Sequence, residues 1–95
     1  MNKKHAVICY SDHHIQKSLL LKKKFLSEIV IFYFQNSVLK KFGHDQPIII
    51  NDKLVSNFDS FIFYTLTVNK VNIKLCELVH QQKKQIIAFQ ESNQL

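Results

Sequence analysis

The sequence has no arginine and no tryptophan, and only one glycine and one proline among its 95 residues. Its longest uncharged stretches, such as residues 29–39, fall short of the roughly 20 apolar residues that a membrane-spanning helix needs. The basic start at residues 1–5 is followed by too few apolar residues for a signal peptide, so we expect a cytoplasmic protein. Hydrophobic residues make up 46% and charged residues 21% of the chain, which favours a folded domain over disorder.

All 13 basic residues are lysines, and the net charge is +6. Lysine neutralises phosphate but lacks the planar fork with which arginine binds phosphates and base edges. The runs at 22–24, 40–41 and 83–84 keep a small Lys-rich nucleic-acid-binding protein open as an alternative. Because consecutive lysines point in different directions around a helix, a solvated surface is the simpler interpretation.

The two cysteines, Cys9 and Cys76, lie far apart in apolar surroundings and form no C-x-x-C motif. We expect both thiols to be buried and reduced. The pair His13–His14 does not predict a metal site, because adjacent residues of a helix point about 100° apart. The sequence therefore predicts neither a metal nor a redox centre.

Apolar patterning predicts alternating strands and helices, with the first two strands parallel and joined by a helix that Ser11 or Asp12 caps. Gly43 is expected to close a short helix, and Asn51–Asp52 to form the tight turn of an antiparallel hairpin. The expected elements are, in order, strand 6–10, helix 14–26, strand 29–34, short helix 36–42, strand 46–50, strand 54–55, helix 61–66 and helix 73–89.

Two boundaries depend on weaker signals. Asp59 is expected near the N-cap of the helix at 61–66, although a strand over 61–68 is the alternative. We divide the chain into a domain over 1–70 and a C-terminal helix with a fraying tail over 71–95.

A family resemblance enters through the segment Gln46–Ser60. It is similar to the second half of glutaredoxins and of glutathione S-transferase N-terminal domains, with an X-Pro pair, a strand, a turn, a short strand, and an acidic residue and serine opening a helix. Tyr10–Asp12, before a lysine-rich helix, resembles the first strand–helix turn of the transferases. The resemblance implies an α/β, thioredoxin-like β-α-β-α-β-β-α fold, with a four-stranded mixed sheet plus one C-terminal helix.

The resemblance also implies a glutathione-type ligand site. Pro47 would follow a cis peptide bond and leave the backbone of Gln46 free to pair with an extended peptide. Asp59 and Ser60 would meet the γ-glutamyl end, with Ser11 near the thiol; the alternative is that Asp59 and Ser60 only cap a helix. No thiol stands at the start of the first helix, where glutaredoxins carry their nucleophile, so no catalytic residue is expected.

These features predict a non-catalytic thioredoxin-fold protein-interaction module, similar to regulators of the stringent starvation protein A family, with RNA polymerase as the implied partner. The alternative is a glutathione-binding transferase-like or glutaredoxin-like enzyme, with glutathione as the ligand and with Ser11 or Tyr10 activating its thiol. We also expect the C-terminal helix to expose apolar residues to a partner or to a second copy of the chain. These residues are Leu75, Leu78, Ile86 and Ile87.

Overall fold

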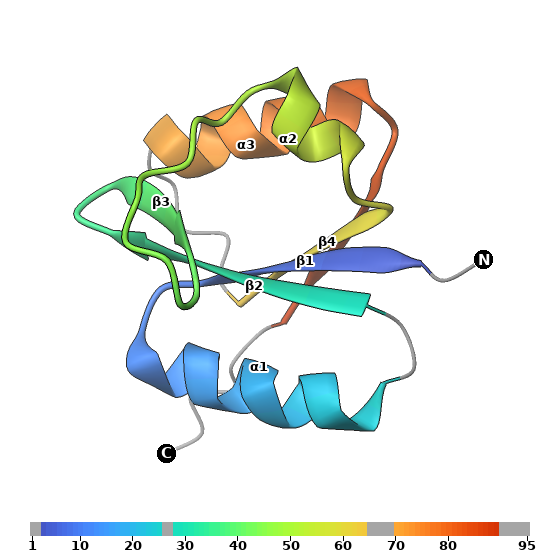
Figure 1. Cartoon of the computed structure of the whole chain (residues 1–95). Helices are drawn as coiled ribbons and strands as arrows, with labels where there is room; N and C mark the ends of the chain where they lie inside the picture. Colours follow the sequence, from blue (N-terminus) through green and yellow to red (C-terminus); the bar gives the residue numbers. More distant parts are fainter. Residues whose placement is uncertain (1–2, 26–27, 65–69, 90–95) are drawn as a thin grey trace, which may run out of the picture.

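The computed structural model describes residues 3–25, 28–64 and 70–89. In these residues a sheet is covered by α1 on one face and by α2 and α3 on the other (Figure 1), so the α/β class is confirmed. The elements are, in chain order, β1 (Lys4–Cys9), α1 (Asp12–Lys24), β2 (Glu28–Gln35), β3 (Val38–Lys41), α2 (Asp52–Ser56), β4 (Ser60–Phe63), α3 (Lys70–Gln81) and β5 (Gln85–Ala88).

The sheet of the described residues has the strand order β3-β2-β1-β4-β5. β1 lies at its centre and pairs in parallel with β2 and with β4, and β5 pairs in parallel with β4. β3 pairs antiparallel with β2 at one edge, so the sheet is mixed, as expected, but it has five strands instead of four. From β1 the chain continues to β2 on one side, and from β4 it continues to β5 on the other side. The strand order therefore reverses between β1 and β4.

Each face of the sheet has its own apolar layer, because side chains alternate along a strand. The layer between the sheet and α1 contains Val7, Cys9, Ile15, Ile29, Ile31, Ile62 and Tyr64. The layer facing α2 and α3 contains Ala6, Ile8, Phe32, Leu39, Val55, Phe58, Phe61, Phe63, Leu75 and Val79. β1 and β4 are thus buried on both sides, which explains their uninterrupted apolar sequences.

The first strand, the following helix and the second strand are confirmed, as is the parallel pairing of the two strands. Ser11 is the N-cap of α1, and its hydroxyl oxygen accepts a hydrogen bond from the backbone N–H of His14 at 3.3 Å. The predicted cap and the predicted strand–helix–strand unit therefore agree with the structure.

The expected helix over 36–42 is wrong, because these residues form a β-hairpin between β2 and β3. Asn36 and Ser37 occupy the turn with φ values of 52° and 63°. Two central residues with positive φ match the twist of adjoining strands, and asparagine tolerates this conformation better than most residues. Gly43 follows the hairpin with φ 86° and closes no helix.

The expected strands over 46–50 and 54–55 are also wrong. Pro47 forms only an isolated bridge with Lys40, and its peptide bond is trans rather than cis. Asn51 is the N-cap of α2, where its side-chain oxygen accepts from the N–H of Leu54 at 3.0 Å. The Asn51–Asp52 pair therefore begins a helix instead of turning a hairpin, since asparagine is favoured in both places.

The expected helix over 61–66 is replaced by β4, which confirms the strand alternative for Phe61–Phe63; residues 65–68 lie outside the described part. This segment pairs with β1 from Ser60 to Phe63 and is buried on both faces. The β-branched and aromatic residues that weakened the helix prediction are those that a central strand favours.

The expected helix over 73–89 ends early, at Gln81, and Lys83 reverses the chain with φ 56°. Residues 85–88 then form β5, which joins the same sheet as β1. The C-terminal segment thus adds a strand to the sheet through β5 and a covering helix through α3. The resulting order, β-α-β-β-α-β-α-β, differs from the thioredoxin-like order that the resemblance implied. None of the described helices is long and apolar enough to cross a membrane.

The apolar face of α3 packs on the sheet, and Leu75 and Val79 are fully buried there. The expectation that Leu75 is exposed to a partner is therefore wrong. Leu78 is half-buried, and the other two residues of that expected surface, Ile86 and Ile87, belong to β5. The predicted tail over 91–95 lies outside the described residues.

Candidate functional site

The residues of the predicted glutathione-type site lie at different places around the sheet. Ser11 follows the carboxyl end of β1, whereas Ser60 pairs with His5 near the amino end of the same strand. The strand residues from His5 to Cys9 separate these levels, and they span about 13 Å at roughly 3.3 Å per residue. The bridge between Pro47 and Lys40 holds the remaining part of the predicted site beside β3, at the edge of the sheet.

Asp59 and Ser60 join the amino ends of β1 and β4. The Asp59 carboxylate accepts a hydrogen bond from the backbone N–H of Lys4 at 2.8 Å, and the Asp59 N–H donates to the Lys4 carbonyl at 2.8 Å. The Ser60 hydroxyl is buried and hydrogen-bonded to Nδ1 of His5. Their polar groups therefore tie strands together, and they cap no helix, because Ser60 begins β4.

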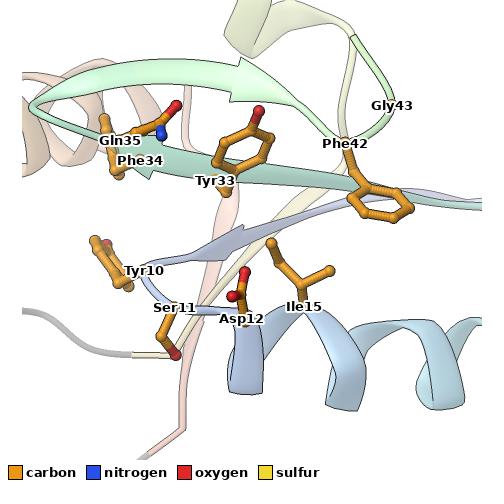
Figure 2. Close-up of a pocket in the computed structure, with 9 residues that line it drawn as sticks. All are labelled: Tyr10, Ser11, Asp12, Ile15, Tyr33, Phe34, Gln35, Phe42 and Gly43. Carbon is orange, nitrogen blue, oxygen red and sulfur yellow. The ribbon is translucent and has the colours of Figure 1, made fainter. Parts of the chain in front are cut away.

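A groove of about 520 Å³ lies instead at the carboxyl ends of β1 and β2 (Figure 2). Its walls come from the β1–α1 turn with the first turn of α1, from the end of β2, and from the turn that follows β3. The lining residues are Tyr10, Ser11, Asp12, Ile15, Tyr33, Phe34, Gln35, Phe42 and Gly43. Its volume falls within the range of small-molecule sites, about 300–1,000 Å³.

The start of α1 fixes one wall of the groove. Ser11 caps the helix through its side chain, and its carbonyl accepts the first helical hydrogen bond, from the N–H of Ile15 at 3.2 Å. Figure 2 shows the side chains of Asp12 and Ile15 rising from this helix toward β2. Ile15 is buried and Asp12 is exposed, so this wall combines an apolar base with a carboxylate at the surface.

Aromatic rings form much of the opposite side. Phe42 points from its turn toward Ile15 (Figure 2), and its backbone N–H donates to the carbonyl of Ile31 at 2.8 Å. Its side chain remains 44% exposed, which leaves ring surface available to a ligand. At one end Tyr10 stacks on Phe34, with ring centroids 5.6 Å apart and an angle of 23° between the planes.

Asp12 is the only charged residue among the described residues that line the groove. Gln35, at the end of β2, is contacted by Lys40 on β3, whose Nζ donates to Oε1 of Gln35 at 3.2 Å. A carboxylate in the first turn of a helix is stabilised by the positive end of the helix dipole. The groove therefore presents one anionic group beside aromatic surface.

A buried polar cluster lies behind this site, where α1 packs against the ends of β1 and β4. The rings of His14 and Tyr64 stack at 4.6 Å, and Nδ1 of His14 accepts from the N–H of Tyr10 at 3.0 Å. The thiol of Cys9 lies 3.3 Å from the hydroxyl of Ser18. Burial, opposed by this hydrogen bond, raises the pKa of Cys9 to about 11, so the thiol stays protonated near neutral pH.

Cys76 is half-buried and unbridged, and burial raises its pKa as well. The expectation of free thiols is confirmed for both cysteines, and that of burial for Cys9. Within residues 3–25, 28–64 and 70–89, no three histidine, cysteine or carboxylate side chains are grouped as a metal site requires.

Of the residues predicted for the glutathione-type site, only Ser11 lines the groove. The sequence did contain a signal for other residues of the groove, because ligands of open α/β sheets bind outside the carboxyl ends of parallel strands. The two parallel strands were predictable, and Asp12 and Gln35 stand at or just beyond their ends. The contribution of Phe42 was not predictable, since it depends on the hairpin that brings this residue back beside β2.

Comparisons of the chain with protein-family models, with curated proteins and with solved structures find no match.

Proposed function

We propose that this chain is a small-molecule-binding protein whose ligand occupies the groove at the carboxyl ends of β1 and β2. The observation that carries the proposal is the groove itself, about 520 Å³ with aromatic walls and one carboxylate. Concave surfaces that combine apolar and polar groups are typical of ligand sites, and α/β proteins bind ligands outside the carboxyl ends of parallel strands. The groove lies on the β2 side of β1, next to the reversal of strand order between β1 and β4.

The proposed activity is binding without thiol chemistry. Cys9 is buried in the layer facing α1, and its raised pKa keeps it as an unreactive thiol. A protein partner, RNA polymerase included, and a nucleic-acid partner stay predictions from the sequence, and the groove does not depend on them.

The proposed site differs from the glutathione-type site that the resemblance implied. That site would need Ser11 and the Asp59–Ser60 pair to contact one tripeptide. Ser11 follows the carboxyl end of β1, whereas the Asp59–Ser60 pair lies beside the amino end of the same strand. Glutathione therefore serves as a comparison ligand in the test, and we expect its addition to leave the amide signal of Asp59 unshifted.

The test is a titration of the ¹⁵N-labelled chain with a set of small aromatic compounds that includes neutral, cationic and anionic members. Binding in the groove should shift the amide signals of Asp12, Ile15, Gln35 and Gly43. Phe42→Ala should weaken binding about tenfold, because it removes an exposed ring from the wall of the site.

Phe25→Ala is the matched control, since Phe25 is also an exposed phenylalanine, 54% accessible, but lies beyond the far end of α1. It should leave the affinity unchanged. Equal effects of the two substitutions, or shifts confined to other parts of the chain, would show that the groove is not the binding site.

A further inference from the structure

We propose that the ligand of the groove is a small organic cation, a primary or methylated ammonium group attached to an apolar or aromatic body. This inference rests on the proposed function and adds the chemical class of the ligand. It follows from the charge of the lining residues, from the unpaired state of that charge, and from the aromatic rings beside it.

The first step is the carboxylate of Asp12. Among the described residues, no side chain or backbone N–H forms a hydrogen bond or ion pair with it, although the chain carries a net charge of +6. The ammonium group of Lys40 donates to the lining residue Gln35. The groove thus has one anionic group whose hydrogen-bonding capacity is available to a ligand.

The second step concerns desolvation. A neutral apolar ligand that filled the groove would remove water from the Asp12 carboxylate and offer nothing in return, which opposes binding. An anionic ligand would add repulsion, and the lining residues include no cationic side chain to offset it. An ammonium group compensates the lost hydration with a charge-assisted hydrogen bond or, when fully methylated, with Coulomb attraction.

The third step is the aromatic lining. Tyr33 from β2 and Phe42 from the turn after β3 line the same groove as Asp12 from α1. The faces of aromatic rings carry partial negative charge and attract ammonium groups, and such rings around a cation form the sites that bind quaternary amines. Ile15 and the stacked rings of Tyr10 and Phe34 supply apolar surface for the body of the ligand.

The experiment compares four probes that share a benzyl or phenethyl group but differ in charge. These are benzyltrimethylammonium, phenethylamine, benzyl alcohol and phenylacetate, each titrated into the full chain and followed by amide shifts and by calorimetry. We expect both cations to bind about tenfold or more tightly than benzyl alcohol, and phenylacetate to bind most weakly.

Asp12→Asn removes the charge while keeping the size of the side chain, and it should lower the affinity for both cations about tenfold without lowering the affinity for benzyl alcohol. Asp52→Asn is the matched control, because Asp52 is the first residue of α2 behind an asparagine N-cap, as Asp12 is the first residue of α1 behind a serine N-cap. Asp52 does not line the groove, so its substitution should leave all four affinities unchanged.

The outcomes separate the two proposals. If the probes shift the groove signals with no preference for positive charge, or if Asp12→Asn leaves cation binding intact, the ligand class is wrong while the binding site stands. If no probe binds, or if all shifts lie outside the groove, the proposed function and the inference both fail.

Discussion

The buried hydroxyl of Ser18 provides the sharpest test of how α1 is held on the sheet. Ser18 is fully buried, and its oxygen lies 2.8 Å from the carbonyl of His14, 3.1 Å from the hydroxyl of Tyr64 and 3.3 Å from the thiol of Cys9. A hydroxyl has one hydrogen and a carbonyl can only accept, so Ser18 donates to His14 and accepts from its other neighbours. Ser18→Ala would therefore deprive buried donors of this acceptor.

The magnitude follows from two opposing effects. Leaving a buried polar group unsatisfied costs about 1–3 kcal/mol, and the better helix propensity of alanine returns about 0.5 kcal/mol. We expect Ser18→Ala to lower the free energy of unfolding by about 1–2 kcal/mol, measured by urea denaturation and circular dichroism. Tyr64→Phe should lower it by about 1 kcal/mol, and the double variant should lose about 1 kcal/mol less than the sum.

Ser56→Ala is the control for this cycle. Its hydroxyl also donates to the carbonyl four residues earlier, Asp52, at 2.8 Å, but Ser56 is exposed in α2. We expect a change within about 0.5 kcal/mol, as for most surface substitutions. The reasoning would be refuted if Ser18→Ala and Tyr64→Phe were additive within about 0.3 kcal/mol, or if Ser56→Ala cost as much as Ser18→Ala.

Two further predictions concern the core. Burial raises the pKa of Cys9 from 9.0 to about 11, so the thiol ionises at a lower pH in the unfolded chain than in the folded one. The contribution of the protonated thiol to the free energy of unfolding is therefore intact below pH 9. It should be lost between pH 9 and 11, at up to about 1.4 kcal/mol per pH unit. Cys9→Ala should show a shallower alkaline loss in denaturation curves, and equal slopes would contradict the assignment. Leu75→Ala should cost about 2–5 kcal/mol, because Leu75 is fully buried, whereas Ile49→Ala, at a side chain 76% exposed, should cost little. Similar urea midpoints for these two variants would show that α3 does not pack as described.

The sequence predicted the elements whose local and tertiary preferences agree. In the apolar runs that became β1 and β2, β-branched and aromatic residues favour the strands that the sheet requires, and the serine cap favours the helix between them. Asn36, Gly43 and Asn51 were ambiguous, because the same residues favour hairpin turns, helix ends and helix starts. For Asn36, the pairing of β2 with β3 decided the outcome.

The part of the candidate site that depends on local sequence was predictable, and the part that depends on tertiary contacts was not. Ser11 and Asp12 follow directly from a strand and begin a helix, so their place at the carboxyl edge of the sheet could be inferred from the local pattern. Phe42 lines the groove only because the hairpin returns the chain to β2. The sequence around Asp59 and Ser60 is typical of ligand or cap residues. The pairing of β4 with β1 instead places them at the amino ends of these two strands.

The amino-acid sequence by itself determined that this chain is an α/β protein with a parallel pair of buried strands joined by a capped helix, because these features depend on residue periodicity and on caps a few residues apart. Only the tertiary structure decided that Phe61–Phe63 is a central strand and that residues 85–88 extend the same sheet. A short apolar segment fits a buried helix or a buried strand equally well, and the choice depends on which partners the rest of the chain brings beside it.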